Sequence, residues 1–321
     1  MTFPGVSVIL GTAGFGEHGR ITTVALAKEF LDTFKSAGAN VVDTAYAYPG
    51  GFNGESETFL GILEAEKHGF VLDTKVRSFE TNAHTPESII ASVDEQFARL
   101  RVSKVRTLYL HCPDRSTPYE DTHRAMNELY KLGKFERFGL SNFRASEVEV
   151  FVNLAEEHNW VRPTVYQGIY NIVSRLNEQD LFPVLRKHNI NFFAFSPLAV
   201  GFFSNVRRGQ EPVSGSRFDA NTRQGQRLRA RYFKESFFDA VEKIEKVGHK
   251  YNLTNNAIAL RWLKHHSQMS DGDAIIIGAS KIQQVKENLI SLEEGELPEE
   301  IVNVVNEVWE FVKVDAPAYS R

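Results

Sequence analysis

Eight short apolar segments, separated by amphipathic ones, constrain the fold of this chain more than any other feature of its sequence. The apolar segments are typical of buried strands, and they occupy residues 6–10, 41–43, 71–75, 105–111, 138–141, 165–167, 191–195 and 274–278. Between them lie segments with helical periodicity, including residues 23–37, 56–66, 87–100 and 122–132. Strands that alternate with helices at intervals of roughly 30 residues favour an α/β fold with its parallel sheet closed into a (β/α)8 barrel, the TIM barrel.

An open, doubly wound sheet is the alternative α/β architecture. Such a sheet is expected to carry the spacing Gly-x-Gly-x-x-Gly after its first strand, where the glycines approach a dinucleotide. Here the first apolar segment is followed by Gly11-Thr-Ala-Gly14-Phe-Gly16, in which the glycines are spaced differently. We therefore predict one barrel domain that covers residues 1–321.

One interval is much longer than the others. A polar segment at residues 199–234 and two expected helices at 237–251 and 255–266 separate the seventh apolar segment from the eighth. A long loop after the seventh strand would lie over the C-terminal mouth of the barrel, where active sites of this fold are found. Its many arginines suggest a nearby anion. We also expect an additional helix at the C-terminal end of the chain.

Composition excludes several classes of function. The formal net charge is −4, which gives no electrostatic reason to expect nucleic acid or an anionic membrane as a partner. Cys112 is the only cysteine, so no intrachain disulfide can form and a reducing compartment is expected. The N-terminal residues do not resemble a secretory signal, and no apolar stretch approaches the ~20 residues that span a bilayer. We therefore expect a cytoplasmic location.

Four titratable residues lie at or just beyond the ends of three consecutive strands. Asp43, Lys75 and His111 end the second, third and fourth apolar segments, and Tyr48 follows Asp43 by five residues. An ammonium beside a phenol lowers the pKa of the phenol, and an acid would hold that ammonium in place. The imidazole could bind a carbonyl oxygen. Together these groups suit general-acid catalysis of carbonyl reduction.

The same residues belong to motifs that resemble the aldo-keto reductase superfamily, in particular its aflatoxin-aldehyde and succinic-semialdehyde reductases. The resemblance runs in order through nearly the whole chain and includes Asp43-Thr-Ala-x-x-Tyr48, Asp73-Thr-Lys75, Tyr109-Leu-His111-x-Pro-Asp114, Gly139-Leu-Ser-Asn142-Phe, Pro163-Thr-Val-Tyr-Gln167 and Arg231-Tyr-x-Lys-Glu235. It implies a (β/α)8 barrel, NADPH-dependent reduction of carbonyl compounds without a metal, and a catalytic tetrad of Asp43, Tyr48, Lys75 and His111.

The resemblance also implies a cofactor site. Ser141, Asn142 and Gln167 would hold the nicotinamide carboxamide, and Phe195 would stack on its ring. The remaining residues implied for the cofactor, which extend to its pyrophosphate and adenosine ends, are Asp43, Ser196, Pro197, Leu198, Ala199, Gly201, Ser204, Arg207, Gly278, Ala279, Ser280, Gln284 and Asn288. Two positions depart from the family pattern. A lysine of the subgroup is missing, with Arg207 or Arg208 as its candidate substitute, and Gln284 stands where an arginine is common.

Substrates implied by the resemblance are aromatic aldehydes, dicarbonyls and carboxylated aldehydes such as succinic semialdehyde. Tyr48 and His111 would contact the carbonyl group, and Arg231 and Arg321 would bind a carboxylate. The subgroup further suggests a homodimer. Two other functions remain open at this point: a cofactor-sensing regulatory subunit of the same fold, as found with potassium channels, and a lyase that uses Lys75 as a Schiff-base amine.

Overall fold

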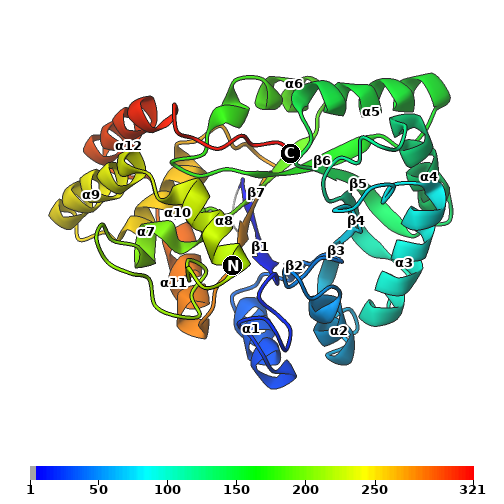
Figure 1. Cartoon of the computed structure of the whole chain (residues 1–321), viewed down its shortest axis with the longest axis horizontal. Helices are drawn as coiled ribbons and strands as arrows, with labels where there is room; N and C mark the ends of the chain where they lie inside the picture. The colour runs from blue at the N-terminus through cyan, green and yellow to red at the C-terminus, as the bar shows by residue number, and fades with distance from the viewer. Residues whose placement is uncertain (1–4) are drawn as a thin grey trace.

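Eight parallel strands form a closed barrel at the centre of the molecule (Figure 1). The computed structural model describes residues 5–321. Each strand pairs with the next one along the chain, and β8 pairs with β1. The strands are β1 (Ser7–Gly11), β2 (Val41–Asp43), β3 (Val71–Val76), β4 (Val105–Leu110), β5 (Phe135–Ser141), β6 (Pro163–Ile169), β7 (Asn191–Phe195) and β8 (Ala274–Ile277). The prediction of a (β/α)8 barrel is confirmed.

Helices surround the barrel and connect its strands. They are α1 (Val24–Ser36), α2 (Glu55–Ile62), α3 (Pro86–Leu100), α4 (Tyr119–Lys131), α5 (Ala145–His158), α6 (Leu181–Lys187), α9 (Glu235–Lys250), α10 (Asn255–His265), α11 (Ile282–Glu293) and α12 (Glu299–Val312), with one turn of 3-10 helix, η1 (Leu176–Glu178). Local chemistry sets several of their starts. The hydroxyl of Thr23 accepts a hydrogen bond from the backbone N–H of Leu26, and Thr85 caps α3 ahead of Pro86 in the same way. The additional C-terminal helix expected from the sequence is α12, which packs on α9 (Figure 1).

The core has two layers. Between the strands and the helices lies a large apolar layer, and a smaller cluster fills the inside of the barrel with Ile9, Tyr109, Val165, Phe193, Ala274 and Ile276. Charged groups share this interior, because Asp43, Asp73 and Lys75 are also buried. Buried charges in a barrel interior require partners. Asp43 pairs with Lys75, and Asp73 pairs with Arg106.

The segment between β7 and α9 is more ordered than the sequence predicts. The expected irregular segment at 199–234 contains η2 (Ala199–Gly201), α7 (Phe202–Asn205) and α8 (Arg223–Tyr232), so that expectation is wrong in part. The physical reason is an aromatic cluster: the ring of Phe202 lies 5.8 Å from that of Tyr232 and 5.4 Å from that of Phe238. These aromatics are widely spaced in the chain and bury the segment against α9.

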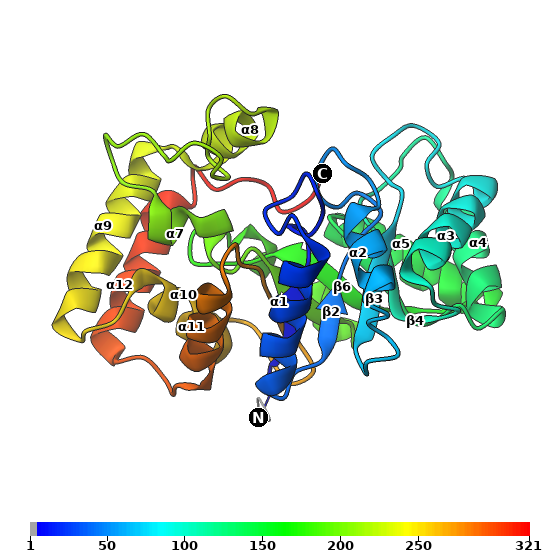
Figure 2. The same ribbon diagram turned by 90° about the horizontal axis from the view of Figure 1, so that it is seen from below.

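The two ends of the barrel differ in what they carry. Figure 2 shows α8 and the C-terminus together at one end of the molecule. The C-terminal end of the chain reaches the mouth at β5, where the backbone N–H of Arg321 donates to the carbonyl of Asn142 (3.0 Å). Among residues 5–321, no helix combines the length and apolar character needed to cross a bilayer.

Candidate active site

A cavity of about 610 Å³ opens at the C-terminal ends of the strands. Most residues that the sequence implicates in catalysis, cofactor binding or substrate binding line it: Asp43, Tyr48, His111, Ser141, Asn142, Gln167, Phe195, Ser196, Pro197, Leu198, Gly201, Ser204, Arg231, Gly278, Ala279, Ser280, Gln284, Asn288 and Arg321. Apart from Arg321, they come from the ends of six strands or from the segments that follow them, which is how this fold assembles a site from distant parts of a chain.

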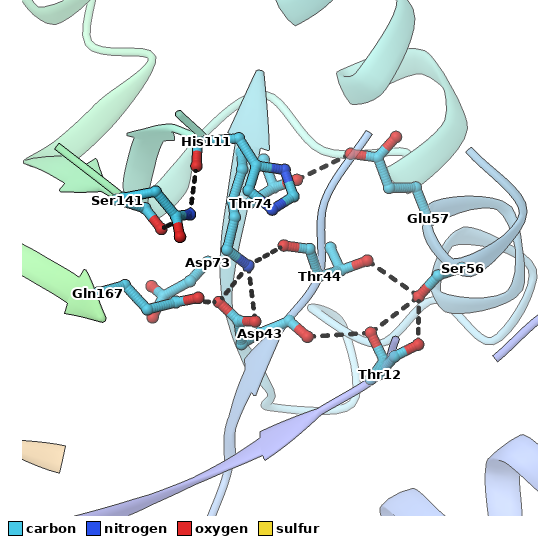
Figure 3. Close-up of polar contacts among 12 residues, drawn as sticks. Thr12, Asp43, Thr44, Ser56, Glu57, Asp73, Thr74, His111, Ser141 and Gln167 are labelled. Carbon is cyan, nitrogen blue, oxygen red and sulfur yellow. Dashed lines mark hydrogen bonds and ion pairs between the residues drawn. The ribbon is translucent and has the colours of Figure 1, made fainter. Parts of the chain in front are cut away.

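A buried ion pair forms the floor of this site. The Nζ atom of Lys75 on β3 donates to both carboxylate oxygens of Asp43 on β2 (2.8 and 2.7 Å) and to the carbonyl of Thr44 (2.8 Å) (Figure 3). The Nε2 atom of Gln167 on β6 donates to Asp43 Oδ1 (2.7 Å). Lys75 is fully buried and contacts the cavity through its partners.

The charge state of Lys75 follows from these contacts. Burial of the carboxyl raises the pKa of Asp43, and the neighbouring ammonium acts in the opposite direction. Burial lowers the pKa of Lys75, but Asp43 and Tyr48 outweigh it, so the net pKa of Lys75 lies above its ordinary value. Lys75 is therefore an ammonium group. Schiff-base chemistry needs a neutral amine with access to substrate, so this geometry disfavours the lyase reading.

Tyr48 lies between this ion pair and His111. Lys75 Nζ is 4.9 Å from the centre of the Tyr48 ring, and the Tyr48 and His111 rings meet edge to face at 5.7 Å. Burial raises the pKa of Tyr48, while Lys75 lowers it. The net shift is upward, so the expectation that Lys75 brings the phenol below its ordinary pKa is wrong for this structure, because desolvation dominates. Tyr48 thus carries its proton.

His111 is held as a neutral imidazole. Burial and the nearby positive charge of Lys75 lower the pKa of His111 well below its usual range. Its backbone N–H donates to Ser78 Oγ (3.1 Å), and its carbonyl accepts from Asn142 Nδ2 (2.9 Å). Within residues 5–321 its Nδ1 atom has no hydrogen-bond partner. The backbone is thus fixed while the ring remains available to a ligand in the cavity.

Sequence comparison identifies the class of protein to which this site belongs. Residues 7–310 match the Aldo/keto reductase family. The chain belongs to the aldo-keto reductase family. It is 37% identical over 315 residues to human aldo-keto reductase family 7 member A3, covering 94% of this chain and 92% of the relative. It is 34% identical over 333 residues to human aflatoxin B1 aldehyde reductase member 2, covering 99% of this chain and 90% of the relative. It is also 37% identical over 322 residues to the oxidoreductase sirO of Leptosphaeria maculans, covering 98% of this chain and 96% of that relative.

Membership in this family makes the protein an oxidoreductase. The family and its aldehyde-reductase relatives support reduction of aldehydes or ketones, and nicotinamide cofactors are general in the family.

The exit of β7 carries backbone strain in this aldo-keto reductase. Ser196, Ala199 and Val200 have positive φ angles of 54°, 47° and 62° without being glycine, and Gly201 follows at 92°. Left-handed conformations of non-glycine residues are uncommon and concentrate at functional sites. Three of these four residues line the cavity, whereas Ala199 is buried beneath them.

Arg207 does not reach the cavity, contrary to the expectation that it replaces a missing lysine. Its guanidinium donates to Glu245 on α9 (3.0 Å) and to the carbonyl of Val206 (2.9 Å), and it is absent from the residues within 5–321 that line the cavity. The next residue, Arg208, pairs with Glu235, Asp239 and Glu242. The acidic face of α9 therefore draws both arginines away from the mouth.

Two arginines that were not among the expected cofactor residues do line the cavity. Arg20, from the loop after β1, and Arg217, from the segment before α8, line the cavity. Burial and the charge of Arg217 lower the pKa of Arg20 to about 9, and burial lowers that of Arg217. Within residues 5–321 no carboxylate pairs with either. The sequence shows Arg217 only as one of several loop arginines and gives no signal for Arg20.

The two arginines implicated in substrate binding also reach the cavity. The Nε atom of Arg231 is buried without a hydrogen-bond partner among residues 5–321. The guanidinium of Arg321 lies over the ring of Phe79, 4.9 Å from its centre, and Phe79 in turn packs against His111. The carbonyl oxygen of Arg321 accepts from Arg115 Nη2 (2.6 Å).

Proposed function

We propose that this protein reduces aldehydes and ketones with NADPH, and that Tyr48 is the general acid. The observation that carries the proposal is the position of the Tyr48 phenol, which lies on the cavity wall between a neutral imidazole and a buried ammonium group. When bound, the nicotinamide cofactor supplies the hydride. A screen of NADPH oxidation across aldehydes, ketones and dicarbonyls, repeated with NADH, tests the proposal directly.

Each member of the tetrad has a separable task. The neutral imidazole of His111 can donate an N–H to the carbonyl oxygen and so place that oxygen near the Tyr48 hydroxyl. Tyr48 then gives its proton to the oxygen as negative charge develops there. The Lys75 ammonium offsets the charge left on the phenolate, and Asp43 keeps Lys75 charged and in place.

The residues of the cavity fit an anionic dinucleotide. Arg20 and Arg217 are largely buried cations for which the described residues provide no counter-ion, and burying an uncompensated charge is costly. The phosphates of a dinucleotide would supply the missing charge. Ser141, Asn142 and Gln167 line the cavity and would hold the carboxamide through their hydroxyl and amide groups, and the N-terminus of α11 would bind a 2′-phosphate.

Gln284→Arg is expected to raise the preference for NADPH over NADH, measured as the ratio of kcat/KM values, by about tenfold. In the structure Gln284 Oε1 accepts from the backbone N–H groups of Ser280 (2.9 Å) and Lys281 (3.2 Å). An arginine would release both donors and add a guanidinium, which binds phosphate strongly.

The matched control is Gln283→Arg, which adds the same charge one residue earlier on α11, at an exposed position where Gln283 contacts Glu287. An equal change with both cofactors, or the same change in both variants, would place the 2′-phosphate elsewhere.

Arg231→Gln is expected to reduce kcat/KM for succinic semialdehyde by roughly ten- to a hundredfold more than for 2-nitrobenzaldehyde, which lacks a carboxylate. The reason is that Arg231 lines the cavity and its buried Nε has no hydrogen-bond partner among residues 5–321, so it can donate to a carboxylate. Such charge-assisted pairs contribute about 1.5–3 kcal/mol. Arg227→Gln, on the exposed side of α8, is the control. An equal loss on the two aldehydes would contradict a carboxylate-binding role.

A further inference from the structure

Three buried hydroxyls lie immediately behind the Asp43–Lys75 pair. Thr12 follows β1, Thr44 follows β2 and Ser56 lies in the first turn of α2, and all three are fully buried. Ser56 Oγ is 2.8 Å from Thr12 Oγ1 and 2.9 Å from Thr44 Oγ1 (Figure 3). We refer to Thr12, Thr44 and Ser56 as the hydroxyl cluster.

The hydrogen bonds of the hydroxyl cluster lead to the ion pair. Thr12 Oγ1 donates to the carbonyl of Asp43 (3.0 Å), and Ser56 Oγ donates to the carbonyl of Thr12 (3.0 Å). Each hydroxyl has one proton, so Thr44 is left to donate to Ser56. This bond fixes Thr44, whose carbonyl is the acceptor that Lys75 uses besides Asp43. Ser56 therefore holds Thr44, whose carbonyl accepts the remaining hydrogen bond of the Lys75 ammonium.

Ser56 also contacts the loop that carries the proposed acid. Its backbone N–H donates to the carbonyl of Tyr48 (3.2 Å). Its side chain does not cap α2, because the residue at the N-cap is Gly54 and makes no side-chain bond there. One residue thus binds Tyr48 through its backbone and Thr44, the partner of Lys75, through its hydroxyl.

We propose that Ser56 is a positioning residue that aligns Lys75 with Tyr48 through Thr44. This inference rests on the proposed function, in which Tyr48 is the acid and Lys75 supports it. The hydroxyl of Ser56 contacts neither the cavity nor the ion pair directly, so it acts only through Thr44 and Thr12.

The pH dependence of activity reports on this alignment because Ser56 itself has no charge. The charged and titratable groups around Lys75 and Tyr48 come from β2, β3, β4, the loop after β4 and the segment before α8. They are Asp43, Asp73, Arg106, Tyr109, His111 and Arg217. Removal of the Ser56 hydroxyl leaves all of these in the protein. A changed pH profile would then come from a changed geometry of Lys75 and its acceptors.

Ser56→Ala is expected to reduce kcat/KM for an aldehyde by about ten- to a hundredfold, because small misplacements of catalytic groups have effects of this size. The dissociation constant of NADPH should change by less than about twofold, since the hydroxyl cluster lies behind the ion pair and outside the cavity. When the Thr44 carbonyl is held less firmly, it stabilises the Lys75 ammonium less, and Lys75 loses its proton at a lower pH. The alkaline limb of the profile of kcat/KM against pH therefore moves to lower pH.

Two further variants make the result decisive. Thr44→Val removes the same hydrogen bond from its other side and should reproduce the pH shift. The double variant, Ser56→Ala with Thr44→Val, should lose little more kcat/KM than either single variant. Thr58→Val is the control: its hydroxyl donates to the carbonyl of Gly54 (2.9 Å), the N-cap residue of the same helix, and its removal should leave the pH profile unchanged.

If Ser56→Ala does not fold, Thr44→Val decides the question. Wild-type pH profiles in both variants, or the same shift in Thr58→Val, would overturn the proposal. Failure here is distinguishable from failure of the proposed function: an inactive Tyr48→Phe together with an unaltered Thr44→Val removes only the role of Ser56, whereas an active Tyr48→Phe removes the function on which it rests.

Discussion

Tyr48→Phe is expected to lower kcat for aldehyde reduction by about a hundredfold to ten-thousandfold, the range that general acids contribute. The substitution removes one oxygen and leaves the ring packed edge to face on His111 and near Lys75. The dissociation constant of NADPH, measured by quenching of protein fluorescence, should therefore remain close to that of the wild type. Loss of turnover with intact cofactor binding is the signature of a missing proton donor.

Tyr46→Phe provides the matched control for this experiment. Tyr46 lies two residues earlier in the same loop, and the guanidinium groups of Arg77 and Arg99 lie 4.7 and 5.2 Å from the centre of its ring. That packing needs the ring and not the hydroxyl, so kcat should stay near the wild-type value. Wild-type turnover by Tyr48→Phe would show that another group donates the proton.

Lys75→Met is expected to lower the free energy of unfolding by about 3–5 kcal/mol, because it leaves the Asp43 carboxylate buried without its counter-ion. Lys75 is the donor of two bonds to Asp43, and neither side chain reaches bulk solvent to any useful extent. Urea denaturation at neutral pH measures the loss. Reductase activity should fall with it, since the ammonium proposed to support Tyr48 is gone.

The destabilisation of Lys75→Met should shrink as the pH falls. Burial already raises the pKa of Asp43, and loss of the ammonium raises it further. A carboxyl whose pKa is higher in the folded protein than in the unfolded chain favours folding at low pH and opposes it as the pH rises through the folded-state pKa. The variant should therefore recover part of its stability at mildly acidic pH.

Lys28→Met shows what loss of an ordinary lysine does. Lys28 pairs with Asp32 on α1 at 2.6 Å, but both side chains are more than half exposed. Exposed ion pairs contribute about 0–1 kcal/mol, so the free energy of unfolding of Lys28→Met should differ little from that of the wild type. If Lys75→Met lowered the free energy of unfolding no more than Lys28→Met, the Asp43–Lys75 pair would have no special role in stability.

The strands could be predicted from the sequence because nearly all of them are buried on both faces and appear as uninterrupted apolar segments. The start of β5 could not, since Glu136 and Arg137 interrupt its apolar pattern although Phe135 is buried. The segment before α9 was expected to be irregular for a related reason. Its buried aromatics, Phe202 and Tyr232, are thirty residues apart, and only the folded chain brings their rings together.

Positions of the proposed tetrad could be predicted because strand ends of a barrel converge on one mouth. The arginines could not be sorted by the same argument. Arg207 turns to Glu245, and Arg217 enters the cavity, through contacts between segments that are distant in the chain. The residues next to each arginine in the sequence do not reveal which distant acidic residues compete for it. The upward shift of the Tyr48 pKa was missed for a similar reason, since burial is a property of the whole fold.

The uncompensated arginines of the cavity have a kinetic consequence. The protein carries a net charge of −4, the same sign as a dinucleotide. Arg20 and Arg217 place positive charge at the mouth. A local field of this kind guides an anion during its approach, and dissolved salt weakens that guidance without altering the fit of the bound state. The rate of cofactor capture is therefore the quantity most sensitive to the ionic composition of the surroundings.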